Sequence, residues 1–203
     1  MLALAIAGVA ADVVSRLLVA ARRASEWTAA GLVYGVFGLA GLALVAAGDL
    51  PLIDDAWWVL AAFWLAVVLF AGTRAFVALT AGWPLMARAV ARTYGYRGRL
   101  GVWVTLAASC AIGAGEELFW RGIVPTAVEA SAAAVIAWAG YVAVNILGRN
   151  AALIAGALVA GGVWAWLAVA SGGVLAPVVC HAVWTALMVL FPPRSVLPAA
   201  TAS

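Results

Sequence analysis

The sequence predicts an all-α protein, a polytopic integral membrane helical bundle with about seven transmembrane helices. Hydrophobic residues make up 68% of its 203 positions and charged residues only 9%, whereas a soluble domain has about 25% charged residues. Long apolar runs also recur along the whole chain, separated by short polar turns. At about 20 residues for each crossing, the chain has room for about six or seven crossings in a single membrane domain, 1–203, with no separate soluble module.

The basic residues indicate membrane orientation and not a nucleic-acid partner. The formal charge is +3, and the arginines are scattered between apolar runs without a basic tract, so nucleic-acid binding is not expected. The expected partner is the lipid bilayer, in a plasma membrane of the bacterial type. Cys110 and Cys180 lie in apolar runs without nearby metal ligands, which is typical of small buried hydrophobic residues.

The first apolar stretch allows two interpretations. It contains Asp12 and Arg16, which are four positions apart and would meet on one helical face. Such a segment either spans the membrane or lies at its surface. In the second stretch, Gly31, Gly35 and Gly38 lie near one face and permit close helix contact. The expected helices cover, in chain order, 1–21, 29–47, 57–80, 100–128, 131–147, 151–170 and 174–191.

The polar turns predict how the chain crosses the membrane, because cytoplasmic loops collect positive charge. Strict alternation over seven crossings places one set of turns on each side. Arg22, Arg23, Arg149, Arg194 and a main loop over 88–99 fall on the cytoplasmic side; the acidic turn 49–55 and residues 171–173 fall on the other. The N-terminus is then outside and the C-terminus cytoplasmic.

The segment 113–122 carries two adjacent glutamates and an arginine inside an apolar run. Ionisable side chains at bilayer depth are costly, so they generally face a protein interior or a wet cavity and mark functional sites. On a helix, Glu117 and Arg121 can form an ion pair, whereas Glu116 points about 100° away. We therefore expect Glu116 to be the general base. The alternative, a buried ion pair that only fixes helix packing, fits Glu117 and Arg121 but leaves Glu116 unexplained.

Two later helices hold further polar residues. His181 is the chain's single histidine, and within a membrane helix it needs a polar partner, for which the two glutamates are the best candidates. Thr185 lies one turn further on the same face. Asn145 belongs to a stripe with Tyr141 and Arg149; it either joins two helices by a hydrogen bond or takes part in the site, while Arg149 is expected to reach the membrane surface.

If the helices are straight, Glu116 and Asn145 lie at different depths in the membrane. Glu116 would lie about 24 Å from the cytoplasmic start of its helix, whereas Asn145 lies near the cytoplasmic end of its own. Gly113 and Gly115 precede Glu116 and can permit a bend or a displaced helix that closes the gap.

The block 116–121, with the sequence EELFWR, resembles the EExxxR motif of the CPBP family, the type II CAAX prenyl endopeptidases and bacteriocin-processing (Abi) intramembrane proteases. His181 matches the first position of that family's closing HxxxN motif. The resemblance covers about 100–192, and it implies a CAAX-protease-like core there. It also implies that Glu116 activates water and that His181 stabilises the oxyanion. Two positions depart from the family, since Asn145 stands where the middle histidine is expected and Thr185 replaces the closing asparagine.

The resemblance implies an intramembrane endopeptidase with Glu116, His181 and Asn145 as catalytic residues and Glu117, Arg121 and Thr185 as supporting ones. No cofactor or metal is expected, although the family is often labelled metal-dependent, because a catalytic zinc needs about three protein ligands. The alternative is a catalytically weakened member that acts as a membrane scaffold or immunity-type binding protein. A transporter or channel is less consistent with a single polar layer.

Overall fold

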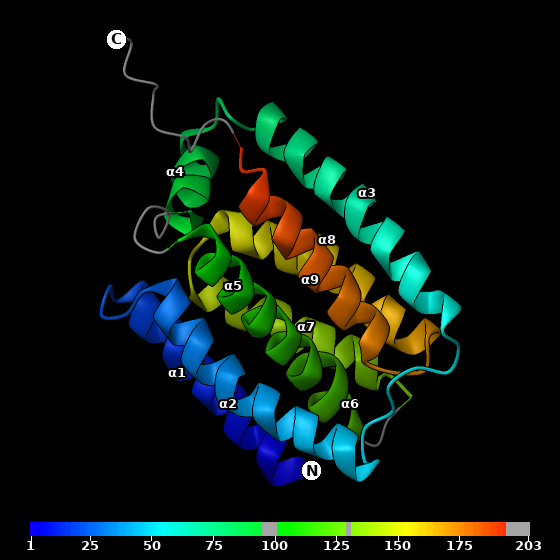
Figure 1. Cartoon of the computed structure of the whole chain (residues 1–203). Coiled ribbons are helices and arrows are strands. Elements are labelled where there is room, and N and C mark those ends of the chain that lie inside the picture. The colour runs from blue at the N-terminus through cyan, green and yellow to red at the C-terminus, as the bar shows by residue number, and fades with distance from the viewer. Residues whose placement is uncertain (95–100, 129–130, 194–203) are drawn as a thin grey trace.

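A computed structural model describes residues 1–94, 101–128 and 131–193, and within these ranges it is entirely helical (Figure 1). The helices are α1 (Leu2–Ala20), α2 (Glu26–Ala47), α3 (Trp57–Leu79), α4 (Pro84–Thr93), α5 (Val102–Glu117), the π-helix η1 (Leu118–Ile123), α6 (Val124–Ala127), α7 (Ala133–Leu147), α8 (Ala151–Ala170) and α9 (Leu175–Leu190).

The length and composition of these helices confirm an integral membrane bundle. Five helical stretches are long and apolar enough to cross a bilayer, namely α1, α2, α3, α8 and the continuous run Val102–Ala127. The shorter helices α7 and α9 are apolar as well. The first stretch, for which two interpretations were open, forms one of the five candidate spans. Its Asp12 and Arg16 are buried against the rest of the bundle.

Helix α5 lies at the centre of the arrangement. It packs against α2 on one side and α9 on the other, and α9 in turn packs against α3 at the edge of the bundle (Figure 1). Helices α7 and α8 pair with each other, and α1 contacts both α2 and α7. The first turn of α5, with Trp103, is exposed, whereas its last turn, with Glu116 and Glu117, is buried by protein, where charges can find partners.

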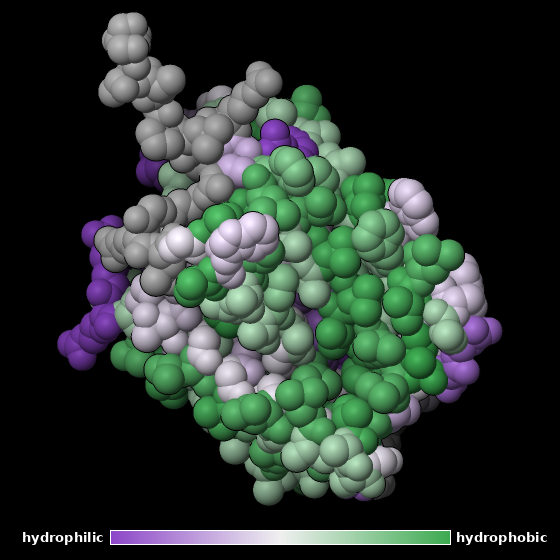
Figure 2. All heavy atoms as spheres, viewed as in Figure 1, coloured by the Kyte–Doolittle hydropathy of each residue, from purple (hydrophilic) through white to green (hydrophobic). Residues whose placement is uncertain are grey.

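Polar residues gather at the two ends of the bundle, and an apolar band separates them (Figure 2). At one end Arg92 pairs with Glu26, with Nε 2.9 Å from Oε1, and also donates to the carbonyl of Gly148 at 3.3 Å. At the other end the backbone N–H of Asp54 donates to the carbonyl of Ser171 at 2.8 Å. The turns are thus grouped in the two sets that alternation predicts.

The prediction of a loop over 88–99 is wrong for residues 88–93, which are helical. Residues up to Thr93 belong to α4, which begins with Pro84 at its first turn and buries Met86, Ala89 and Val90 on one face. This spacing is that of an amphipathic helix, and the arginines between the apolar positions obscure it in the sequence. Residues 95–100 and Arg194 lie outside the described part of the chain.

Helix α5 continues without interruption through Gly113 and Gly115. These glycines allow close approach. A Cβ on Gly38 of α2 would lie only 2.8 Å from the Cα of Gly115, so the two backbones nearly touch. The helix changes geometry after Glu117, where the wider π-helix η1 begins, a feature often found at functional sites.

Candidate active site in the membrane

The last turn of α5 directs its two glutamates to different neighbours. Both carboxylates are buried, Glu116 at 8% exposed and Glu117 at 0%. Since adjacent helical residues diverge by about 100°, each carboxylate meets a different set of helices. The site therefore has two connected parts, one around each glutamate.

Glu117 holds both a histidine and an arginine. Its Oε1 lies 2.8 Å from Nδ1 of His181, and its Oε2 lies 3.2 Å from Nε of Arg121. The ion pair predicted from the four-residue spacing is present, although its atoms are not aligned as a hydrogen bond. Arg121 Nη2 donates to the carbonyl of Gly161 at 2.8 Å, and the guanidinium lies over the ring of Tyr141. Glu117 thus fixes α9 as well as its own helix.

His181 is held tightly on α9. Its ring stacks on Trp164 of α8 with centroids 3.8 Å apart and planes 12° from parallel. An ionised carboxylate only accepts hydrogen bonds, so the contact with Glu117 requires the hydrogen on Nδ1 and directs Nε2 to the other side. There the ring lies against the backbone of α5, because a Cβ on Gly113 would be 3.3 Å from Nε2. Gly113 therefore provides space for the imidazole.

Glu116 faces a second group of side chains. It is hydrogen-bonded to the side chain of Tyr141 on α7, and the charged residues that act on it are His181, Arg16 and Glu117. No cation lies three or four positions from Glu116 on its own helix. The cation comes from α1, about 100 residues earlier in the chain, where neither spacing nor motif connects it to the glutamates.

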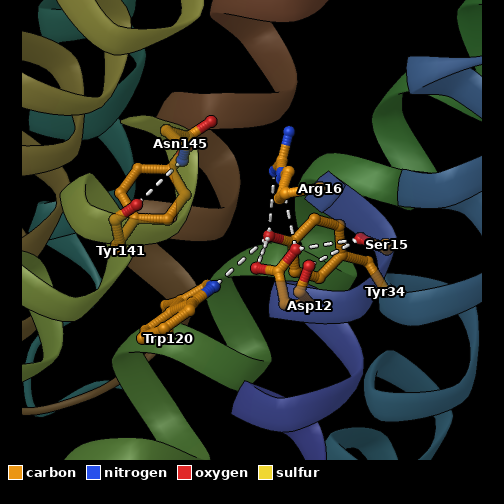
Figure 3. Close-up of polar contacts among 7 residues, drawn as sticks. All are labelled: Asp12, Ser15, Arg16, Tyr34, Trp120, Tyr141 and Asn145. Atoms are coloured by element: carbon orange, nitrogen blue, oxygen red, sulfur yellow. Dashed lines mark hydrogen bonds and ion pairs between the residues drawn. The ribbon is translucent and has the colours of Figure 1, made fainter. Parts of the chain in front are cut away.

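A network from α1 and α2 supports this second part of the site (Figure 3). Arg16 Nε lies 3.2 Å from Oδ1 of Asp12, and the hydroxyl of Tyr34 donates to Oδ2 of Asp12 at 2.7 Å. The indole N–H of Trp120 in η1 donates to the same hydroxyl at 3.3 Å. Sequence reasoning paired Asp12 with Arg16 but did not connect them to the site. The sequence signal for this connection was the presence of charged residues in two separate apolar runs, because charged groups buried in a membrane protein need polar surroundings that they can share.

Asn145 and Thr185 lie at the edges of the site. The amide of Asn145 donates to the carbonyl of Tyr141 at 2.9 Å, and Figure 3 shows both residues on the side of α7 that faces Arg16. Thr185 is partly buried one turn beyond His181. Among the described residues, neither side chain is hydrogen-bonded to Glu116 or His181. The structure therefore groups Glu116, Glu117, Arg121 and His181 closely, with Asn145 and Thr185 less directly connected.

The residues do not fit a bound divalent metal. No group of three or more His, Cys, Asp or Glu side chains gathers as ligands in the described ranges. Glu117 is engaged by His181 on one oxygen and lies beside the positive charge of Arg121 on the other. A dication at this carboxylate would be repelled by the guanidinium, and a structural or catalytic zinc needs three or four ligands.

Comparison with known proteins agrees with this geometry. The family model described as type II CAAX prenyl endopeptidase Rce1-like matches residues 98–187, the region that carries both glutamates, Asn145 and His181. No curated protein and no solved structure matched the chain. The matched region includes α5, η1 and α6 to α8 in full and most of α9. Residues 98–187 of this helical membrane protein are therefore similar to the type II CAAX prenyl endopeptidases of the Rce1-like family.

Proposed function

We propose that the chain is an intramembrane endopeptidase in which Glu116 activates water for hydrolysis of a peptide bond. The observation that supports this is the meeting of Glu116 and His181 from α5 and α9, both buried, with Glu117 holding the imidazole by a 2.8 Å contact. Water supplies the nucleophile, and Glu116 accepts its proton as the oxygen attacks the carbonyl carbon. The same proton then passes to the leaving amine as the C–N bond breaks.

His181 is proposed to stabilise the oxyanion. When the imidazole ring is protonated, Nδ1–H donates to Glu117 and the ring has a second N–H at Nε2. That group can donate to the oxygen on which negative charge develops, in surroundings from which bulk water is largely excluded. Tyr141 orients the Glu116 carboxylate, and Arg16 supplies compensating charge. Glu116 works here without the second base that a histidine at position 145 would provide.

The test is cleavage of a fluorogenic prenylated CaaX peptide by the full chain in proteoliposomes. We expect slow cleavage by the native protein and a gain of about 10²-fold in Asn145→His, because a positioned general base contributes about 10²–10⁴-fold.

The second candidate function, a non-catalytic membrane scaffold or immunity-type binding protein, is favoured by the Asn145 amide, which cannot accept a proton at neutral pH. It predicts an inert native protein. If neither form cleaves the prenylated peptide or an unprenylated peptide library, the endopeptidase proposal fails.

We further propose that the arginine-rich end is cytoplasmic, in a plasma membrane of the bacterial type. The reason is the grouping of Arg22, Arg23, Arg92 and Arg149 at one end of the bundle, opposite the turn that holds Asp54 and Asp55. A fluorescent protein fused after residue 203 is expected to fold and fluoresce, and a phosphatase that is active only outside the cell is expected to stay inactive there. The reverse pattern would invert the orientation.

A further inference from the structure

A cavity of about 830 Å³ opens at the arginine-rich end of the bundle, separate from the glutamate site. It lies where α1 turns into α2, and α4 and the turn between α7 and α8 complete its wall. The charged residues that line it are Arg22, Arg23, Arg92, Arg149 and Glu26. Its volume is that of a typical small-ligand site.

The lining is strongly positive. Four arginines against one glutamate leave a formal charge of +3. Glu26 is already neutralised, because Arg92 Nε lies 2.9 Å from its Oε1 and the Asn150 amide donates to both oxygens at 3.0 and 3.2 Å. Within the described ranges, Arg22, Arg23 and Arg149 have no acidic partner. Their charge is therefore available to a ligand.

The floor of the cavity is well ordered by hydrogen bonds between distant segments. Asn150 joins Glu26 of α2 to Thr93 of α4, with 3.1 Å to the Thr93 hydroxyl, and its side-chain oxygen accepts from Ala152 N–H at the start of α8. Arg92 ties the same floor to the carbonyl of Gly148. These contacts hold three arginine-bearing segments in a fixed relation.

Two of the arginines occupy an unusual backbone conformation. Arg22 has φ 58° and Arg149 has φ 54°, and they are the non-glycine residues with positive φ in the described chain. The left-handed conformation is unfavourable for an L-residue with a long side chain, because its Cβ approaches the following carbonyl oxygen. Glycine or asparagine would adopt the left-handed conformation at positions 22 and 149 with less strain. We therefore infer that arginine stands there because of its charged side chain.

We propose that this cavity binds a phosphate-bearing anion, with the headgroup of an anionic phospholipid as the natural source. A preference for positive charge at the cytoplasmic face accounts for arginines at this end, but it does not account for their convergence from three segments on one cavity. Trp27 also lines the cavity, and tryptophan is enriched at the headgroup level of membranes. Basic pockets between helices at this level suit phosphate groups.

The experiment measures binding of dioleoyl phosphatidylglycerol to the purified full chain in mixed micelles of an uncharged detergent. Dioleoyl phosphatidylcholine and inorganic phosphate serve as separate probes. The test variant is the double substitution Arg22→Asn and Arg149→Asn, because asparagine tolerates left-handed backbone and preserves both turns. Arg88→Gln is the matched control, an exposed arginine of α4 at the same end that does not line the cavity.

We expect saturable binding of phosphatidylglycerol, weakened about fivefold for each arginine removed and about 25-fold in the double variant. Arg88→Gln is expected to change binding less than about twofold. Binding of inorganic phosphate with the same dependence on Arg22 and Arg149 would support the site and identify the source as soluble. Equal weakening by Arg88→Gln, equal affinity for phosphatidylcholine, or no saturable binding of either anion would overturn the proposal.

Discussion

Glu116→Gln is expected to lower peptide cleavage by about 10³-fold while the protein remains folded. Glutamine keeps the shape of the side chain and can still pair with Tyr141, but it cannot accept the proton of the attacking water. A neutral amide also avoids the desolvation cost of a buried carboxylate, which offsets the lost attraction to Arg16 and His181, so the folded state should tolerate the change. The measurement is the cleavage rate of the prenylated peptide in proteoliposomes, at equal amounts of folded protein.

Asp49→Asn provides the control for loss of one negative charge. Asp49 is exposed at the opposite, acidic end and is distant from the proposed chemistry. Its substitution is expected to leave the cleavage rate within about twofold of the native value. Retention of full activity in Glu116→Gln would exclude Glu116 as the base and direct attention to Glu117 and His181 as the remaining pair.

Gly115→Ala is expected to destabilise the bundle by about 3 kcal/mol or more, at the upper end of the cost of overpacking a core. The added Cβ would collide with the backbone carbonyl oxygen of Tyr34, and a backbone carbonyl cannot move aside as a flexible side chain can. Relief requires α2 and α5 to separate, which also displaces Tyr34 from Asp12 and Trp120. The measurement is the free energy of unfolding in detergent with increasing denaturant.

Gly35→Ala is the matched control on the partner helix. A Cβ at Gly35 meets nothing within 4 Å, so the substitution should leave stability unchanged or raise it slightly through helix propensity. Equal stability of Gly115→Ala and Gly35→Ala would show that the α2–α5 contact is not rigid. The two variants make the same Gly→Ala change, one where α5 meets the backbone of α2 and one on the exposed surface of α2, so their difference in stability measures that contact.

The fold was largely predictable because a bilayer imposes a simple rule on sequence. Apolar runs of sufficient length identified the helices, and arginines and aspartates in the turns grouped them into two ends. The length and polarity of the apolar runs do not show which glycines of a helix contact a neighbouring helix. Gly31, Gly35 and Gly38 look alike in sequence, yet only Gly38 among them meets the backbone of α5. Amphipathic α4 was missed for a related reason, since its arginines resemble those of a loop.

The site was predictable in part. Local spacing gave the Glu117–Arg121 pair, and the cost of burying a histidine in lipid correctly required a carboxylate partner, which is Glu117. Sequence could not give the contribution of α1, because Arg16 reaches Glu116 only through the packing of α1 against the bundle. The catalytic roles of Glu116, His181, Asn145 and Thr185 remain predictions that the experiments above test.

The Asp12–Arg16 contact has a consequence for biosynthesis. Both charges belong to one helix and lie a single turn apart, so this segment can leave the translocon as a neutralised pair before any later helix has been made. Glu117 and Arg121 have the same arrangement within their own segment. Glu116 and His181 instead have partners on other helices, so the buried polar cluster is complete only when α9 packs against α5.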